Sequence, residues 1–164
     1  MKIALSTDHA GFEDLKHLET FLTSLGHTCV NFGPTEYDAE DDYPVFIFPA
    51  AKAVASGECE RGIIMGGSGQ GEAIAANRVK GVRCALFYGT VTAKGAIDAS
   101  GKSSDDPYEI VKLSRAHNDS NMLSLAARFL SREQMQTAIK IWLEAPGADA
   151  SRHVRRVKKL DEIE

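Results

Sequence analysis

The stretch with the clearest capacity for chemistry is the run 66–72, which reads Gly-Gly-Ser-Gly-Gln-Gly-Glu. It follows a short apolar segment at 62–65 and leads into a helix-compatible segment at 72–78. Four glycines in six positions permit backbone angles that other residues avoid, so successive N–H groups can converge on one ligand. A helix that starts directly after the loop adds unpaired N–H donors and the positive end of its dipole. The run therefore predicts an anion-binding hole; the alternative is a plain strand-to-helix turn, for which one or two glycines suffice.

The residue types that this loop lacks narrow the class of anion. The run has no Lys-Ser/Thr ending, and its G-G-x-G-x-G spacing differs from the G-x-G-x-x-G fingerprint of dinucleotide-binding proteins. It ends instead in Glu72, a negative charge where nucleotide-binding loops avoid one. A carboxylate beside an oxyanion hole suits proton abstraction next to a carbonyl, because the N–H groups stabilise the enediolate oxygen that forms. The alternative for Glu72 is an ordinary acidic residue in the first turn of a helix.

Composition and charge are those of an ordinary globular protein, and the 164 residues fit one domain over 1–164. The net charge is −4, and the basic segment 152–159 lacks interleaved aromatic residues, so nucleic-acid binding is poorly supported. No signal-peptide pattern and no apolar stretch of membrane-spanning length is present, and we expect a cytoplasmic protein without a membrane partner. The three scattered cysteines lack metal-ligand spacing, which predicts reduced, buried thiols and no metal site.

Alternating strands and helices must position these groups. Apolar patterns predict strands at 3–7, 28–32, 62–65, 82–87 and 121–125. Helices are predicted at 12–25, 45–54, 72–78, 131–143 with a capping box at its start, and about 149–163, the last one basic. Strand–helix alternation with short connections implies a three-layer α/β/α sandwich around a five-stranded parallel sheet, a Rossmann-like fold.

Asp8 and His9 follow the first predicted strand, as the glycine loop follows the third. In parallel α/β folds, ligands bind beyond the carboxyl ends of the strands, where both loops lie. Asp8 and His9 are therefore candidate site residues. The alternative is a helix N-cap at Asp8 beside a surface His9.

Six motifs together resemble the ribose-5-phosphate isomerase type B family, which also includes galactose-6-phosphate isomerase subunits. They occur in the order of the family and cover nearly the whole chain: 8–11 (DHAG), 42–44 (DYP), 66–72 (GGSGQGE), 75–77 (AAN), 115–119 (RAHND) and 152–156 (RHVRR). The loop resembles the branch of the family that uses a glutamate base. The other branch has a cysteine base at the start of this loop, where this chain has Gly66, and Cys59 and Cys84 lie outside the loop.

The resemblance implies interconversion of ribose 5-phosphate and ribulose 5-phosphate through a cis-enediolate, with no metal and no cofactor. Glu72 is then the base that moves the proton between C2 and C1, and Ser68 assists with its hydroxyl. The oxyanion hole is implied to consist of the backbone N–H groups of Gly67, Ser68, Gly69, Gln70 and Gly71. Partial desolvation is expected to raise the pKa of Glu72 and make it a stronger base.

The resemblance also implies roles for residues elsewhere in the chain. His117 opens the sugar ring, Asp8 holds the sugar hydroxyls, and Tyr43 and Asn118 line the sugar site. The implied phosphate-binding residues are His9, Arg128, Arg152, His153 and Arg156, and guanidinium groups match phosphate oxygens. For the basic run near the C-terminus, a solvated helix face is the alternative. The family further implies a homodimer, or a tetramer, whose active sites are shared between two subunits, and Leu160 and Ile163 permit such an interface.

One departure from the family pattern is a longer, Gly/Ser/Asp-rich stretch at 99–107, a composition typical of an exposed loop. Because it precedes His117 in the sequence, we expect it to lie close to that residue, to border the substrate entrance and to influence which sugar phosphate is preferred. A neutral surface insertion is the alternative.

Three functional interpretations remain open. The first is a pentose-phosphate aldose–ketose isomerase. The second keeps the chemistry but changes the substrate to a tetrose or hexose phosphate, such as galactose 6-phosphate or allose 6-phosphate. The third is a non-catalytic protein that binds a phosphosugar or nucleotide, against which the combination of Glu72, Ser68 and His117 argues.

Overall fold

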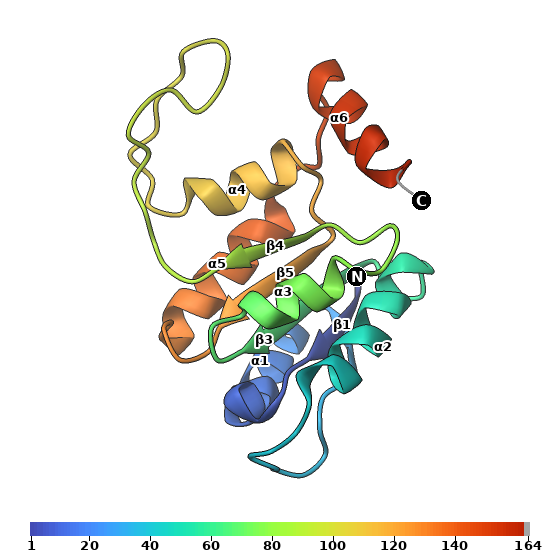
Figure 1. The fold of residues 1–164 in the computed structure, drawn as a ribbon. Coiled ribbons are helices and arrows are strands. Elements are labelled where there is room, and N and C mark those ends of the chain that lie inside the picture. The colour runs from blue at the N-terminus through green and yellow to red at the C-terminus, as the bar shows by residue number, and fades with distance from the viewer. Residues whose placement is uncertain (163–164) are drawn as a thin grey trace.

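Five parallel strands form one sheet with helices on both faces, which confirms the predicted three-layer α/β fold (Figure 1). The computed structural model describes residues 1–162. Its strands are β1 (Lys2–Ser6), β2 (Thr28–Asn31), β3 (Arg61–Gly66), β4 (Cys84–Phe87) and β5 (Met122–Ala126). They lie in the order β2-β1-β3-β5-β4, and every neighbouring pair is parallel.

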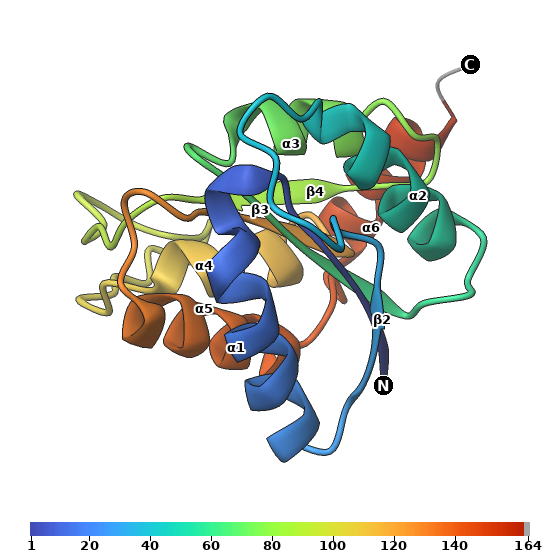
Figure 2. The ribbon, with the colours of Figure 1, turned by 90° about the horizontal axis from the view of Figure 1, so that it is seen from below.

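The helices divide between the two faces of the sheet (Figure 2). On one face lie α1 (Phe12–Ser24), α4 (Glu109–Ala116) and α5 (Arg132–Glu144), and on the other lie α2 (Tyr43–Ala55) and α3 (Gln70–Ala76). A short 3-10 turn (His9–Gly11) precedes α1. The last helix, α6 (Ser151–Asp161), lies beside the end of α4, apart from these layers (Figure 1).

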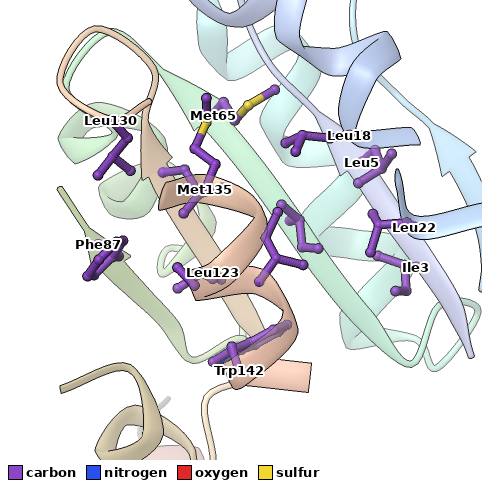
Figure 3. Close-up of a cluster of buried hydrophobic side chains, with 14 of the residues drawn as sticks. Ile3, Leu5, Leu18, Leu22, Met65, Phe87, Leu123, Leu130, Met135 and Trp142 are labelled. Atoms are coloured by element: carbon purple, nitrogen blue, oxygen red, sulfur yellow. The ribbon is translucent and has the colours of Figure 1, made fainter. Parts of the chain in front are cut away.

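Large apolar side chains of α1 and α5 pack on the first face (Figure 3). Leu18 and Leu22 of α1 meet Ile3 and Leu5 of β1, as the helical spacing of the leucines predicts. Trp142 of α5 is fully buried, and its Nε1–H donates to the Ser120 hydroxyl at 2.8 Å. This core packs against the central strands, and the ends of these strands position the candidate functional side chains.

Along β3 the buried side chains alternate between the two cores. Ile63 and Met65 join the first core, whereas Ile64 joins the core under α2 and α3. That second core is rich in alanines, among them Ala50 and Ala76, and small side chains allow helices to approach the sheet closely. A central strand covered on both faces explains the continuous apolar run that predicted β3.

Two helix ends follow the sequence signals that predicted them. Gly26 has φ +82° and ends α1, with the N–H of His27 donating to the Leu22 carbonyl at 3.1 Å. Ser131 and Gln134 form the predicted capping box at the start of α5.

Several predicted boundaries were wrong. No helix was expected between the fourth and fifth strands, yet α4 occupies 109–116. Its sequence signal is weak, because the amphipathic helix is short and has no capping side chain at its N-terminus. The helix after the glycine loop begins at Gln70, two residues earlier than expected, which places Glu72 in its first turn. The basic helix predicted for about 149–163 occupies Ser151–Asp161, and Ile163 lies outside the described residues.

None of the helices within 1–162 has both the length and the apolar character needed to cross a membrane.

Candidate functional site

The carboxyl ends of three neighbouring strands bring together one group of the predicted site residues. Asp8 and His9 follow β1, the glycine loop follows β3, and Arg128 follows β5. The N–H of Arg128 donates to the Gly67 carbonyl at 3.1 Å, which joins two of these loops. We call this group the carboxyl-edge cluster, and it consists of Asp8, His9, Tyr43, residues 67–71, Glu72 and Arg128.

The glycine loop is held in a shape that only glycine permits at one position. Gly69 has φ +72°, and a Cβ there would lie 2.9 Å from the Leu125 carbonyl oxygen. The fully buried Ser124 of β5 donates its hydroxyl to the Gly69 carbonyl at 2.7 Å. Ser124 is not among the residues expected in the site, although a lone hydroxyl within the apolar strand Met-Leu-Ser-Leu-Ala is a signal for a specific buried partner.

Backbone donors line this loop. Among residues 1–162 the N–H groups of Gly67, Ser68, Gly69 and Gly71 have no hydrogen-bond acceptor within the protein. The N–H of Gln70, the fifth expected donor, instead contacts the Ser68 hydroxyl oxygen at 3.3 Å. The loop therefore offers four free donors to an anion, as expected of an oxyanion hole.

Glu72 is buried beside this loop, with 4 % of its surface exposed. A Cβ built on Gly66 would lie 1.9–2.2 Å from the carboxyl atoms of Glu72, so the carboxyl group fills the space next to Gly66. The pKa of Glu72 is raised, chiefly by burial and further by the negative charge of Asp8. A hydrogen bond from its own backbone N–H and the charge of His9 lower it in part. The expectation that desolvation raises this pKa is confirmed, and a carboxylate so placed is a stronger base than an exposed one.

His9 and Arg128 together form a cationic end of the cluster. The Nε2 of His9 lies 3.4 Å from an Arg128 Nη, and the Arg128 guanidinium lies over Gly67, 3.3 Å from where a Cβ would be. The Nδ1 of His9 lies 2.7 Å from an oxygen of Asp41, a residue that sequence analysis did not single out. The pKa of His9 is raised, chiefly by this hydrogen bond and further by the negative charges of Asp8 and Asp41. Burial and the positive charge of Arg128 act in the opposite direction and lower it.

Asp8 and Tyr43 complete the cluster from two other elements. Asp8 caps the 3-10 turn by accepting from the Ala10 N–H at 2.9 Å, as the alternative interpretation of this residue proposed. Its second oxygen lies 3.8 Å from His9 Nδ1, so Asp8 also belongs to the site. Tyr43 begins α2, and its ring end lies about 3 Å from a Cβ built on Gly71.

One set of side chains in this cluster has the composition of a metal site. Ligand atoms of Asp8, His9 and Asp41 all lie within 4.8 Å of one another. However, His9 Nδ1 is already engaged with Asp41, and one Asp8 oxygen caps the following turn. Metal binding would have to break the first of these bonds, so the arrangement fits a hydrogen-bonded cluster better than a cation site.

The remaining predicted site residues lie elsewhere, at the amino end of the sheet. His117 ends α4, and its ring stacks on that of His153 in α6, with centroids 4.2 Å apart. Arg152 donates from Nε to His153 Nε2 at 3.1 Å, and the pKa of His153 is lowered by burial and by the charges of His117, Arg152 and Arg156. We call this group the amino-edge cluster; its predicted site residues are His117, Asn118, Arg152, His153 and Arg156.

An ionic network holds the turn after His117 and connects it to α6. Asp119 has φ +45°, unusual for a residue other than glycine, and its carboxylate pairs with Arg83 at 3.1 Å and Arg115 at 2.8 Å. Arg83 also binds both oxygens of Asp161 in α6, at 2.9 and 3.0 Å. A cavity of about 650 Å³ lies beside this network, and Asn118 and Asp161 are among the residues that line it.

The two clusters lie at opposite ends of the strands within one subunit. Glu72 follows the carboxyl end of β3, whereas His117 precedes the amino end of the neighbouring β5. The last residue of β3, Gly66, pairs with the last residue of β5, Ala126, so the carboxyl ends of the two strands lie together. The five residues of β5 span about 13 Å between the two edges.

The longer loop does not adjoin His117, contrary to the sequence-based expectation. The connection 88–108 leaves the carboxyl end of β4, extends away from the sheet, and returns to the first turn of α4, whereas His117 follows the last turn of α4 (Figure 1). The eight residues of α4 separate the two by about 12 Å. Asp98 organises the loop by accepting from the N–H and hydroxyl of Ser100 at 2.8 and 2.6 Å.

The cysteines offer no competing nucleophile. Cys29, Cys59 and Cys84 are free thiols, and only Cys59 is fully buried, so the prediction of buried thiols holds in part. Burial raises the pKa of each of them, which keeps the thiols protonated.

Comparison with known proteins places this geometry in a family. The model of the family described as "Ribose/Galactose Isomerase" matches residues 3–101 and 105–160. The chain is 34 % identical to ribose-5-phosphate isomerase B of Mycolicibacterium paratuberculosis over 164 residues, which cover 100 % of this chain and 92 % of the relative. Its identity to ribose-5-phosphate isomerase B of Escherichia coli is also 34 %, covering 99 % and 96 % of the two chains. The structure of ribose-5-phosphate isomerase B from Mycoplasma genitalium with bound ribulose 5-phosphate superposes with a TM-score of 0.82 at 29 % identity, covering 98 % of this chain and 93 % of that one.

Proposed function

Because the chain belongs to the ribose/galactose isomerase family and is an aldose–ketose isomerase, we propose that it interconverts ribose 5-phosphate and ribulose 5-phosphate without a metal. The position of Glu72 carries this proposal. A buried carboxylate with a raised pKa lies beside four free backbone N–H groups, which is the pairing of base and oxyanion hole that an enediolate mechanism needs.

In the proposed reaction, Glu72 removes the proton from C2 of the open-chain aldose and returns it to C1. Negative charge develops on the carbonyl oxygen as the proton leaves, and the N–H groups of Gly67, Ser68, Gly69 and Gly71 stabilise it. The Ser68 hydroxyl assists at the same end of the sugar, where the proton of the O2 hydroxyl passes to O1 as the C2 carbonyl forms. Gln70 contributes less than expected, because its N–H already has a partner in the loop.

At the other end of the substrate, His9 and Arg128 bind the phosphate. Their nitrogens lie 3.4 Å apart, so both can contact the oxygens of one phosphate group. Asp8 lies beside His9, 3.8 Å from its Nδ1, and Tyr43 lies beside Gly71; both contact the sugar hydroxyls in the proposed complex.

The amino-edge cluster then belongs to the site of a second copy of the chain. The separation of the two edges supports a homodimer in which His117 and Asn118 of the partner subunit complete each carboxyl-edge cluster. His117 of the partner subunit opens the sugar ring. Arg152 and Arg156 add charge to the phosphate end, beside His153, whose Nε2 accepts from Arg152. Reciprocal sharing by twofold symmetry makes both sites of a dimer complete.

The decisive experiment is an assay of ribulose 5-phosphate formation from ribose 5-phosphate by the purified protein in the presence of a chelator. Turnover that persists with the chelator supports the proposal in full. Turnover that the chelator abolishes contradicts metal independence, and no turnover contradicts this choice of substrate.

A second candidate is isomerisation of another sugar phosphate, favoured by the long connection 88–108, which leaves the sheet at the same edge as Glu72. A panel containing a tetrose phosphate, galactose 6-phosphate and allose 6-phosphate distinguishes the two. A non-catalytic phosphosugar-binding protein would turn over none of these, and its Glu72→Gln variant would bind them as the wild type does.

A further inference from the structure

Asp41 is a buried carboxylate in the connection between β2 and α2, and none of the roles assigned above involves it. Its side chain is 6 % exposed. One oxygen, Oδ1, lies 2.7 Å from His9 Nδ1 and 3.3 Å from the backbone N–H of His9. The other oxygen, Oδ2, is buried and has no hydrogen-bond partner among residues 1–162. Burying a charged group with so few partners is costly, which indicates that its contact with His9 has a purpose.

The contact determines which nitrogen of His9 faces the substrate. A carboxylate oxygen only accepts hydrogen bonds, so Nδ1 of His9 must carry a proton and donate it to Asp41. The Nε2 atom then faces an Arg128 Nη, 3.4 Å away. A guanidinium only donates, so the neutral ring accepts there with its Nε2 lone pair, and only the protonated ring has an Nε2–H to donate to a phosphate. In the neutral ring, this Nε2 would present a lone pair to the phosphate and repel it.

The charges around His9 favour its protonated form. Two negative carboxylates lie near His9 Nδ1: Asp8 at 3.8 Å and Asp41 at 2.7 Å. Arg128 is the positive neighbour. Glu72 also lies near enough to interact with His9, which lowers the pKa of Glu72. The two carboxylates outweigh the single guanidinium, and the pKa of His9 is raised, chiefly by the hydrogen bond to Asp41. In this form both ring nitrogens are donors.

We propose that Asp41 is a positioning residue of the phosphate site: it accepts the hydrogen bond from His9 Nδ1 and thereby directs a proton-bearing Nε2, beside Arg128, at the substrate phosphate. Asp41 itself contacts neither the sugar nor the reacting carbons. The inference deepens the proposed function and rests on it for the identity of the substrate.

The test is the Asp41→Asn variant, assayed with ribose 5-phosphate across the range from about pH 5.5 to about pH 9. The amide oxygen keeps accepting from the backbone N–H of His9, which disfavours the flipped amide, so mainly the charge is lost. Without this negative charge the pKa of His9 should fall, so that near neutral pH Nε2 no longer donates to the phosphate. The KM of the variant should therefore rise about tenfold, the worth of that one charge-assisted hydrogen bond, with kcat within about twofold.

The pH dependence gives this test its specificity. Below the lowered His9 pKa of the variant, both proteins carry a protonated His9, so the ratio of their KM values should return toward one. Protonation of the phosphate itself affects both proteins equally and cancels in the ratio. A KM ratio that does not change with pH, or a loss confined to kcat, overturns the proposal.

Two further variants separate positioning from a general structural effect. Asp38→Asn is the matched control, because Asp38 is an exposed aspartate of the same connection whose side chain accepts from the Glu40 N–H. Its substitution keeps the backbone carbonyl that accepts from the Asp41 N–H, and it should leave KM unchanged. In a His9→Gln background, Asp41→Asn should add no further rise in KM. An equal rise in both backgrounds means that Asp41 acts on the fold of the loop and overturns the proposal.

Binding of inorganic phosphate provides a readout that does not depend on the isomerase activity. Calorimetry should show weaker phosphate binding by Asp41→Asn than by the wild type near neutral pH, with the difference vanishing at acidic pH. Equal affinities at every pH overturn the role of Asp41. If the wild type binds phosphate as described but does not turn over ribose 5-phosphate, the proposed substrate is wrong and the role of Asp41 stands.

Discussion

The carboxyl group of Glu72 occupies the space that a side chain at position 66 would need. A Cβ on Gly66 would lie 1.9 Å from Cδ of Glu72 and 2.0 and 2.2 Å from its two oxygens, far inside van der Waals contact. Position 66 is where the other branch of the family resembled here has its cysteine base. The carboxyl group of Glu72, the proposed base, and a side chain at position 66 therefore exclude one another sterically, which accounts for glycine at position 66.

Gly66→Ala should consequently inactivate the enzyme by displacing its base. We expect kcat to fall about a hundredfold, because a displacement of about 1 Å misaligns the proton transfer. Gly95→Ala is the matched control, since nothing lies within 4 Å of a Cβ there. Steady-state kinetics of both variants measure the effect, and a Gly66→Ala enzyme with wild-type kcat would show that the carboxyl group of Glu72 need not lie against Gly66.

Glu72→Gln should remove the proton shuttle and leave the shape of the site intact. The expected loss in kcat is about a thousandfold, within the usual contribution of a general base, with KM little changed. Glu133→Gln is an informative control, because Glu133 is an exposed acid in the first turn of α5. If the two substitutions lowered kcat equally and only slightly, Glu72 would have no catalytic role and would be an ordinary acidic residue in the first turn of α3.

The same Glu72→Gln variant should be more stable than the wild type at neutral pH. The pKa of Glu72 is raised in the folded state by burial, so the folded protein binds this proton more tightly than the unfolded chain does. The wild type therefore loses stability as the pH rises through the folded-state pKa, a loss that glutamine avoids. Thermal melts from about pH 4 to about pH 8 should show a higher Tm for the variant at neutral pH and a vanishing difference near the ordinary pKa of glutamate. A higher Tm for the wild type at neutral pH would contradict this sign.

Sharing of sites between subunits predicts complementation between two inactive variants. Glu72→Gln and His117→Ala should each be nearly inactive alone, but a mixed dimer has one site with both defects and one with none. Random reassociation of equal amounts makes half of the dimers mixed, so about a quarter of wild-type activity should return. Activity of the mixture, measured after unfolding and refolding together, tests this. A mixture as inactive as its parents would show that Glu72 and His117 serve the same site from one chain, or no common site.

The long connection between β4 and α4 should influence substrate preference if it borders the entrance to the site. Deleting residues 99–106 removes its outer part and keeps Val91 N–H donating to the Pro107 carbonyl at 3.0 Å, which closes its base. We expect the ratio of kcat/KM values for pentose and hexose phosphates to change by several-fold, with little loss of stability, because loop length costs little. An unchanged ratio across the substrate panel would identify the segment as a neutral insertion.

Sequence patterns determined the local structure of this protein to a large extent. Alternation of apolar strands and helices was enough to predict the parallel sheet, and the Gly-rich run ending in Glu72 was enough to predict a carboxyl group beside backbone donors. Both depend on neighbours in the chain, where residue type and spacing largely decide conformation. The helix α4 was missed because eight residues without a capping side chain give only a weak periodic signal.

Tertiary structure alone decided which of these groups meet. His9 and Asp41 are 32 positions apart, and the connection that brings them within 2.7 Å has no periodic pattern from which its path follows. Ser124 reaches the Gly69 carbonyl only because β5 lies next to β3, and the same strand order places Glu72 and His117 at opposite edges of the sheet. Contacts of this kind arise from how elements pack, and the free energy of packing depends on the whole core, which no local stretch of sequence contains.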